Sequence, residues 1–145
     1  MANGPKPSDI PLIRRTLAVF KVSSIITGIF LLGLVVMMVC RYGFGVDIEL
    51  GGVSGGLALT NKDAVTGVNV SILLLSLHGW LYVLYLACDF VLWRTVRWSF
   101  LRFLWIAMGG IVPFLSFYFE RQVPRDVEAV VVELTSRDTS QEAAV

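Results

Sequence analysis

Residues 69–93, NVSILLLSLHGWLYVLYLACDFVLW, decide the fold of this chain. Their apolar part, residues 70–92, is long enough for an α-helix to cross about 30 Å of hydrocarbon at 1.5 Å per residue. Two further apolar runs, residues 22–40 and 101–119, are close to the same length. A backbone inside lipid must satisfy its own hydrogen bonds, so each run is expected to be helical. The sequence therefore predicts an all-α membrane protein with three transmembrane helices.

The composition agrees with a membrane protein. Of the 145 residues, 56% are hydrophobic and 16% are charged, and the mean hydropathy is +0.75. The net charge of +1 does not provide the concentrated basic surface that phosphate binding needs, so nucleic acid is not an expected partner. We expect an N-terminal tail with an amphipathic lead-in over residues 1–21, a membrane domain over 22–119, and a polar C-terminal tail over 120–145.

The loop between the first two predicted spans, residues 41–69, is long and rich in glycine. At residues 46–50 aliphatic and acidic side chains alternate, which is a strand pattern, and GGVSGG at 51–56 supplies a turn. Two structures are compatible with this pattern. One is a small hairpin that caps the outer ends of the helices, and the other is an unstructured loop, because a lone hairpin is marginally stable in water.

The distribution of basic residues predicts the orientation. With three spans, the N-terminus and the second loop share one side of the membrane, which carries seven lysine and arginine residues against five on the other side. Basic residues close to membrane ends favour the cytoplasm. We therefore predict a multi-pass protein of the plasma membrane (bacterial inner membrane) with its N-terminus in the cytoplasm and its C-terminus outside.

A polar stripe runs along the predicted second span. At about 100° per residue, five polar side chains fall on one face of this helix. They are Ser71, His78, Tyr82, Tyr85 and Asp89. His78 is the single histidine of the chain and lies near the middle of the span. Ionisable groups at that depth usually face a bundle interior, a partner or a water pocket. The stripe is therefore the candidate site for contact with a partner or a ligand.

Three interpretations of His78 compete. It can be a packing and hydrogen-bonding group between helices, a relay in a ligand or proton path that ends at Asp89, or an axial haem or metal ligand. A lone histidine makes a bis-histidine haem site only across two chains, and no cysteine pair or carboxylate cluster completes a metal site within one chain. The first interpretation is favoured, and we expect no cofactor and no metal. Near the same surface, Lys21 either pairs with Asp89 or extends its ammonium alone to the lipid headgroups.

The predicted third span contains Gly109, Gly110 and Pro113. Proline removes a backbone hydrogen bond and glycine lets neighbouring backbones approach, so these residues predict a kink or a close helix contact. Catalytic motifs such as a Ser-His-Asp arrangement, a P-loop, a dinucleotide fingerprint or a metalloprotease helix do not occur in the sequence. We therefore do not expect an enzyme.

Three stretches carry a resemblance to a known family. They are FKVSSIITGIFLLGL at 20–34, LSLHGWLYVLYL at 75–86 and RWSFLRFLWIAMGGIVPFLSFYFERQV at 97–123. Together they resemble domain of unknown function 3817, whose members are small three-helix integral membrane proteins common in actinobacteria. The positions that match the family pattern are His78, Gly79, Tyr82, Tyr85 and Pro113.

The chain departs from that family in two places. Thr27 stands where the family usually has an acidic residue before the glycine of the first span, and the first loop is longer and richer in glycine. The resemblance implies a three-helix topology and carries no assigned activity. We expect a non-enzymatic accessory or scaffold subunit of a larger membrane complex, with a respiratory-chain complex as the candidate assembly. Its partners would be the lipid bilayer and other membrane subunits. The alternative is a small homo-oligomeric carrier or ligand-binding protein that uses the polar stripe.

Overall fold

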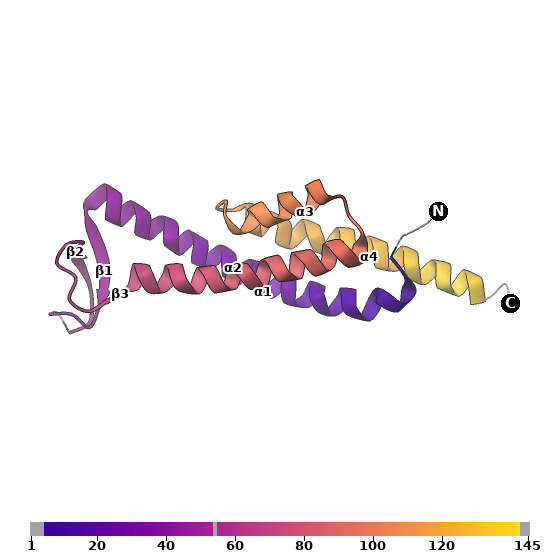
Figure 1. Ribbon diagram of the computed structural model, residues 1–145, viewed down its shortest axis with the longest axis horizontal. Helices are drawn as coiled ribbons and strands as arrows, with labels where there is room; N and C mark the ends of the chain where they lie inside the picture. The colour runs from indigo at the N-terminus through magenta and orange to yellow at the C-terminus, as the bar shows by residue number, and fades with distance from the viewer. Residues whose placement is uncertain (1–4, 54, 143–145) are drawn as a thin grey trace.

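The computed structural model describes residues 5–53 and 55–142 and shows an elongated helical bundle with a small sheet at one end (Figure 1). Residues 1–4 of the expected N-terminal tail, residue 54 of the expected turn and residues 143–145 of the expected C-terminal tail lie outside the described residues. A 3₁₀ turn, Pro7–Asp9, leads into α1, Ile10–Val39. A π-helical turn, Cys40–Phe44, extends α1, and α2 comprises Val70–Val96.

Two helices in the described part of the chain are long and apolar enough to cross a membrane, Pro7–Phe44 and Val70–Val96. In their most apolar windows only 28% and 6% of the residues are buried. The core helix of a soluble protein is mostly buried, whereas these helices present aliphatic side chains outward, as a lipid environment requires. The two apolar helices therefore indicate membrane insertion.

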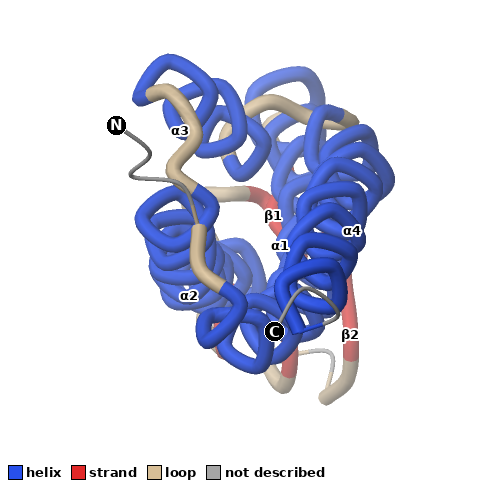
Figure 2. Tube along the Cα trace, turned by 90° about the vertical axis from the view of Figure 1, so that its right-hand side faces the viewer, coloured by secondary structure: helices blue, strands red, loops and turns tan. Residues whose placement is uncertain are grey.

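The helices α1 and α2 run antiparallel and pack closely. The ring centroids of Phe20 on α1 and Tyr85 on α2 are 5.1 Å apart. Near the other end of the pair, a Cβ added to Gly33 would lie 3.0 Å from a methyl carbon of Leu74. Viewed along the bundle, α2 and α4 lie on either side of α1, and α3 occupies one corner (Figure 2).

The third apolar run does not form one helix, so a third continuous span over 101–119 is not confirmed. Instead α3, Phe100–Ala107, passes into a 3₁₀ turn, Met108–Gly110, and the chain reverses before α4 begins at Leu115 (Figure 1). Phe114 adopts a left-handed backbone conformation with φ 71° in this reversal. The break follows from the local chemistry, because Pro113 cannot donate a helical hydrogen bond.

The helix α4, Leu115–Glu142, covers most of the residues for which we expected a polar tail. Val123, Val127 and Val131 recur every four residues and are buried in one cluster with Ile13 and Leu17 of α1. Such spacing makes an apolar stripe on one face of a helix. Because charged residues lie between the valines, the sequence analysis interpreted this segment as a polar tail.

The chain reversal brings the described parts of the two chain ends to the same end of the molecule. The start of α1 and the end of α4 lie at the same end of the molecule, opposite the sheet (Figure 1). The expectation of a C-terminus on the opposite side from the N-terminus assumed three complete crossings, and the side of the membrane on which each end lies stays a prediction.

The first loop folds into a three-stranded antiparallel sheet in the order β2-β1-β3. The strands are β1 (Val46–Leu50), β2 (Leu57–Asn61) and β3 (Val68–Asn69). The hairpin alternative for this loop is therefore correct, and the all-α description of the fold is incomplete. A third strand and a set of side-chain hydrogen bonds add the stability that a lone hairpin lacks.

Candidate functional site

The polar stripe of α2 faces the place where the third apolar run breaks. The hydroxyl of Tyr85 donates to the carbonyl of Ile106 at 2.6 Å, and the hydroxyl of Tyr82 donates to the carbonyl of Ala107 at 3.2 Å. The last carbonyls of a helix lack intrahelical partners, and in lipid they find no water to replace them. The two tyrosines therefore cap the end of α3 from a neighbouring helix.

The glycines of the break make room for these tyrosines. A Cβ added to Gly109 would lie 2.8 Å from the hydroxyl oxygen of Tyr85, and one added to Gly110 would lie 2.2 Å from a ring carbon of Tyr82. Both glycines are buried, and Pro113 is half-buried in the reversal that follows them. Larger residues at the two glycines would push the caps off the helix end.

His78 continues the row of rings along α2. Its ring centroid lies 6.3 Å from that of Tyr82 with the two planes 2° apart, and Tyr82 stacks on Tyr85 at 6.3 Å with an angle of 21°. The half-buried imidazole lies near the backbones of Thr27 and Gly110. Within the described residues, Nδ1 of His78 and the hydroxyl of Thr27 have no hydrogen-bond partner.

Asp89 is the member of the stripe whose carboxyl group lies buried without a partner in the described chain. Its side chain is completely buried, and neither carboxyl oxygen accepts a hydrogen bond from any described residue. The pairing with Lys21 is not formed, because Lys21 is exposed and the ion pairs of the described chain do not include it. An unpaired carboxylate is very costly in apolar surroundings, so a proton or a ligand must neutralise this group.

Ser71 lies apart from the rest of the stripe, at the sheet. It belongs to a cluster around Asp47, which is 1% exposed. Ser71 Oγ lies 3.4 Å from one carboxyl oxygen of Asp47, and the other oxygen accepts from Arg41 at 2.6 Å and from Asn69 at 3.0 Å. The structure therefore divides the predicted site into a satisfied cluster at the sheet and a partly unsatisfied row in the bundle.

Glu49 forms a second acidic centre in the sheet, one that the sequence analysis did not identify. One carboxyl oxygen accepts from the backbone and hydroxyl of Thr66, at 2.6 and 2.9 Å, and from the backbone of Gly67. The other accepts from Thr60 at 2.8 Å. The hydrogen bond from Gly67, followed by that from Thr60, lowers the pKa of Glu49 from 4.5 to about 2.

The sheet is consequently inverted relative to an ordinary water-exposed strand. Asp47 and Glu49 point inward, and the opposite face carries aliphatic side chains. Leu50, Leu57, Leu59 and Val68 make up this aliphatic outer face, with 48%, 71%, 67% and 54% exposure. The alternation of acidic and aliphatic residues at 46–50 indicated two faces in the sequence but not which of them is inward.

A pair of serines joins α1 to α4 beside the break. The hydroxyl of Ser116 donates to the carbonyl of Ser24 at 2.6 Å, and the hydroxyl of Ser24 lies 3.1 Å from both the carbonyl and the hydroxyl oxygen of Ser116. Both side chains are completely buried. The approach is close because Gly28 faces Ser116 and Phe117, whose atoms would lie 3.1–3.3 Å from an added Cβ. These contacts hold the start of α4 against the bundle.

Within residues 5–53 and 55–142, no group of three or more histidine, cysteine, aspartate or glutamate side chains is placed to hold a metal ion. Both cysteines are free thiols, with Cys88 buried and Cys40 partly exposed. The described site therefore consists of hydrogen bonds between helices and the buried carboxyl of Asp89, which has no partner among the described residues.

The family model described as Domain of unknown function (DUF3817) matches residues 17–125. The matched range runs from α1 to the first part of α4 and includes the tyrosine caps and the broken segment. Neither the curated proteins nor the solved structures contain a match to the chain. The chain belongs to this family.

Proposed function

Taking membership of this family as the premise, we propose that the chain is a non-enzymatic accessory or scaffold subunit of a larger plasma-membrane complex. The observation that supports this most is the aliphatic outer face of the sheet. Lipid accounts for the exposed side chains of α1 and α2, but the sheet lies beyond one end of these helices (Figure 1). Contiguous apolar patches in water mark interaction sites, so a protein partner is the expected cover for this face.

The inverted strands strengthen the argument. A sheet that served only to cap the helices would turn its aliphatic side chains to the helix ends and its acids to water. Here the acids are satisfied inside, by Arg41, Thr60, Thr66 and their neighbours, and leucines occupy the outside. Such a face is favourable only when another apolar surface covers it.

The proposed topology has two crossings, by α1 and α2, with α3 and the start of α4 forming a hairpin that enters and leaves the membrane on one side. Ten of the twelve lysine and arginine residues precede residue 22 or follow residue 93 in the sequence. The start of α1, the link between α2 and α3, and the end of α4 lie toward the end of the molecule opposite the sheet (Figure 1), and the positive-inside rule then makes that end the cytoplasmic one. The ten basic residues are Lys6, Arg14, Arg15, Lys21, Arg94, Arg97, Arg102, Arg121, Arg125 and Arg137. The sheet would then lie outside the plasma membrane. A C-terminal reporter that works only in the cytoplasm should be active.

Purification of the tagged chain from native membranes in a mild detergent, followed by mass spectrometry, tests the proposal. A stoichiometric membrane partner should co-elute, and subunits of a respiratory-chain complex are the first to look for. Leu59→Asp should release the partner, because it places a charge in the covered face. Val132→Asp is the matched control, since Val132 is also 67% exposed but lies on α4 at the other end of the molecule. Absence of a partner, or equal loss in both variants, would refute the proposal.

A second candidate function is a small homo-oligomeric carrier or ligand-binding protein. The buried carboxyl of Asp89 favours it, because this group has no hydrogen-bond partner in the described chain. His78, Tyr82 and Tyr85 would line the path to it. Asp89→Asn should then abolish ligand binding and leave the assembly state unchanged, whereas an accessory subunit should keep its partner in this variant.

A further inference from the structure

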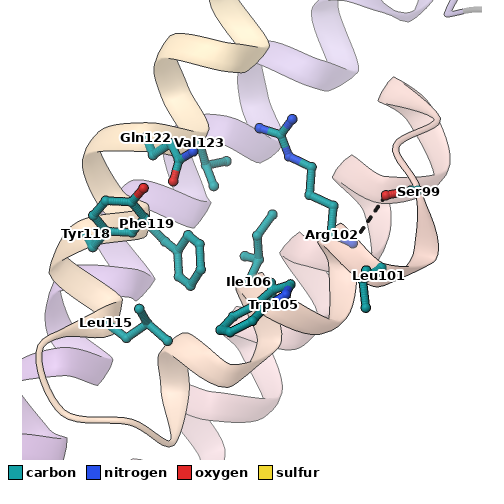
Figure 3. A pocket seen from close by; sticks show the side chains of 10 residues that line it. All are labelled: Ser99, Leu101, Arg102, Trp105, Ile106, Leu115, Tyr118, Phe119, Gln122 and Val123. Atoms are coloured by element: carbon teal, nitrogen blue, oxygen red, sulfur yellow. Dashed lines mark hydrogen bonds between the residues drawn. The ribbon is translucent and has the colours of Figure 1, made fainter.

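An open groove lies between the two arms of the broken third run, α3 and the start of α4. Its volume is about 530 Å³, within the range of roughly 300–1,000 Å³ that is typical of small-molecule sites. Four apolar side chains, Trp105, Ile106, Leu115 and Phe119, project into the space between the helices (Figure 3). Toward the open end of the hairpin the lining becomes polar, with Arg102 among the residues there (Figure 3).

We propose that this groove binds an anionic phospholipid of the surrounding bilayer, with one acyl chain between α3 and α4 and the headgroup at the arginines of the open end. The proposal depends on membrane insertion of the apolar helices and on the hairpin entering from one side. It does not depend on a partner subunit at the sheet, so the two proposals can fail separately.

The dimensions of the hairpin suit an acyl chain. The eight residues of α3 extend about 12 Å at 1.5 Å per residue, which approaches the roughly 15 Å of one bilayer leaflet. The reversal beside Leu115 closes one end of the hairpin, and Arg102 lies toward its open end (Figure 3). A free phosphate or another small anion would leave the aromatic floor of the groove uncovered.

The charges around the open end suit an anionic headgroup. Arg121 and Arg125 border a hollow on α4 that shares Tyr118 and Gln122 with the groove. Both are exposed, and neither makes an ion pair with any described residue. A guanidinium group pairs with a phosphate through two parallel hydrogen bonds, and basic residues near the surface attract anionic lipids.

A second pair of arginines lies at the end of α2 and in the link between α2 and α3, close in sequence to Ser99, which lines the groove. Arg94 and Arg97 border a hollow together with Trp93 and Trp98. The guanidinium of Arg102 lies 4.1 Å from the ring centroid of Trp98 and is ion-paired with Asp126 on α4. Tryptophan is typical of the headgroup level of a bilayer, which places this end of the groove at the membrane surface.

Native mass spectrometry of the full chain in detergent tests the proposal, with dioleoylphosphatidylglycerol and dioleoylphosphatidylcholine as equimolar probes. We expect preferential retention of phosphatidylglycerol. Arg121→Gln combined with Arg125→Gln should weaken that retention about fivefold for each arginine removed. Arg137→Gln is the matched control, because Arg137 lies on the same helix outside the groove and pairs with Glu133. It should leave the preference unchanged.

A groove-filling variant separates the acyl site from the charges. Gln122→Trp keeps the net charge and places a large ring in the groove, so it should lower the retention of phosphatidylglycerol. Three results would overturn the proposal: equal retention of both lipids by the native chain, an equal loss in Arg137→Gln, or full displacement of phosphatidylglycerol by inorganic phosphate. The last result would mean that an anion binds without the acyl chain.

Discussion

Glu49 in the sheet and Asp89 in the bundle are both buried carboxyls, and their surroundings are opposite. Glu49 is 3% exposed and accepts hydrogen bonds from two threonines and a glycine. Asp89 is completely buried and accepts none from the described residues. The first carboxyl holds its own fold together. The second contributes nothing visible to the fold, which makes it the better candidate for chemistry with something outside the chain.

The difference follows from the secondary structure around each acid. A loop can turn its backbone N–H groups toward a carboxylate, as the segment at Thr66 and Gly67 does. A helix uses its N–H groups internally, so an acid on a helix depends on side chains from its neighbours. The hydroxyls of Tyr82 and Tyr85 on the same stripe donate to carbonyls of α3, so they are not available to Asp89.

Glu49→Ala should have the largest effect, because it removes the acceptor of four hydrogen bonds at once. We expect the sheet to lose its order while the helices persist. Hydrogen exchange in detergent should show fast exchange at the amides of Thr66 and Gly67 and along β1. Asp63→Ala, which removes an exposed acid of the same loop, should change nothing. Unchanged protection in Glu49→Ala would mean that the sheet does not need its acidic centre.

Acidification should weaken the same sheet partially. The pKa of Glu49 is lowered from 4.5 to about 2, so the folded sheet binds fewer protons than the unfolded chain between these values. The stabilisation is complete above about pH 4.5, declines as the pH falls, and is lost below about pH 2. Carbon-detected NMR of the carboxyl group should give the titration. Glu49→Gln, which cannot titrate at this position, should show no such decline in sheet stability.

Asp89→Leu should act in the opposite direction and stabilise the fold. Leucine places two methyl groups where the unpaired oxygens lie, and relief of an unsatisfied buried polar group is worth about 1–3 kcal/mol. Thermal or denaturant unfolding in detergent measures the change. Asp138→Leu, at an exposed position, should be close to neutral. A loss of stability in Asp89→Leu would show that the carboxyl has a partner in the native state.

Tyr85→Phe tests the satisfied part of the stripe. It leaves the carbonyl of Ile106 without the cap that the hydroxyl provides at 2.6 Å, and we expect a loss of about 1–2 kcal/mol. Tyr82→Phe should cost less, because its hydrogen bond to Ala107 is longer, at 3.2 Å, and its side chain is only half-buried. Unfolding of both variants in detergent measures the two losses of unfolding free energy, which can then be compared. An equal or larger loss in Tyr82→Phe would contradict the assignment of Tyr85 as the main cap.

Hydropathy and helical periodicity were sufficient to place the two apolar helices and to put His78, Tyr82, Tyr85 and Asp89 on one face of α2. They could not tell a kink from a complete reversal at Pro113. That outcome depends on whether another helix supplies donors for the carbonyls exposed by the break, and a pattern along one segment does not contain this information.

The same limitation applied to the tail and to the sheet. The valines of α4 were hidden among charged residues, and their burial depends on contacts with Ile13 and Leu17, more than a hundred residues away in the chain. The inward direction of Glu49 depends on donors from Thr60 and from the 66–67 segment, and no local propensity specifies those contacts. Local patterns predicted the apolar helices and the first strand, and long-range contacts, apolar for α4 and polar for Glu49, determined the rest.

The smallest effect we expect compares two hydroxyls one turn apart on α1. Ser24 is hydrogen-bonded to Ser116, so Ser24→Ala should cost about 1 kcal/mol. Thr27 is equally buried, but its hydroxyl has no partner among the described residues. Because valine has the same shape, Thr27→Val should be neutral or stabilising by less than about 1 kcal/mol. Both changes are measurable by unfolding in detergent.

The contrary outcome would also be informative. If Thr27→Val destabilises as much as Ser24→Ala, the hydroxyl of Thr27 is hydrogen-bonded in the native protein, and nearby His78 is then the group to examine as its partner.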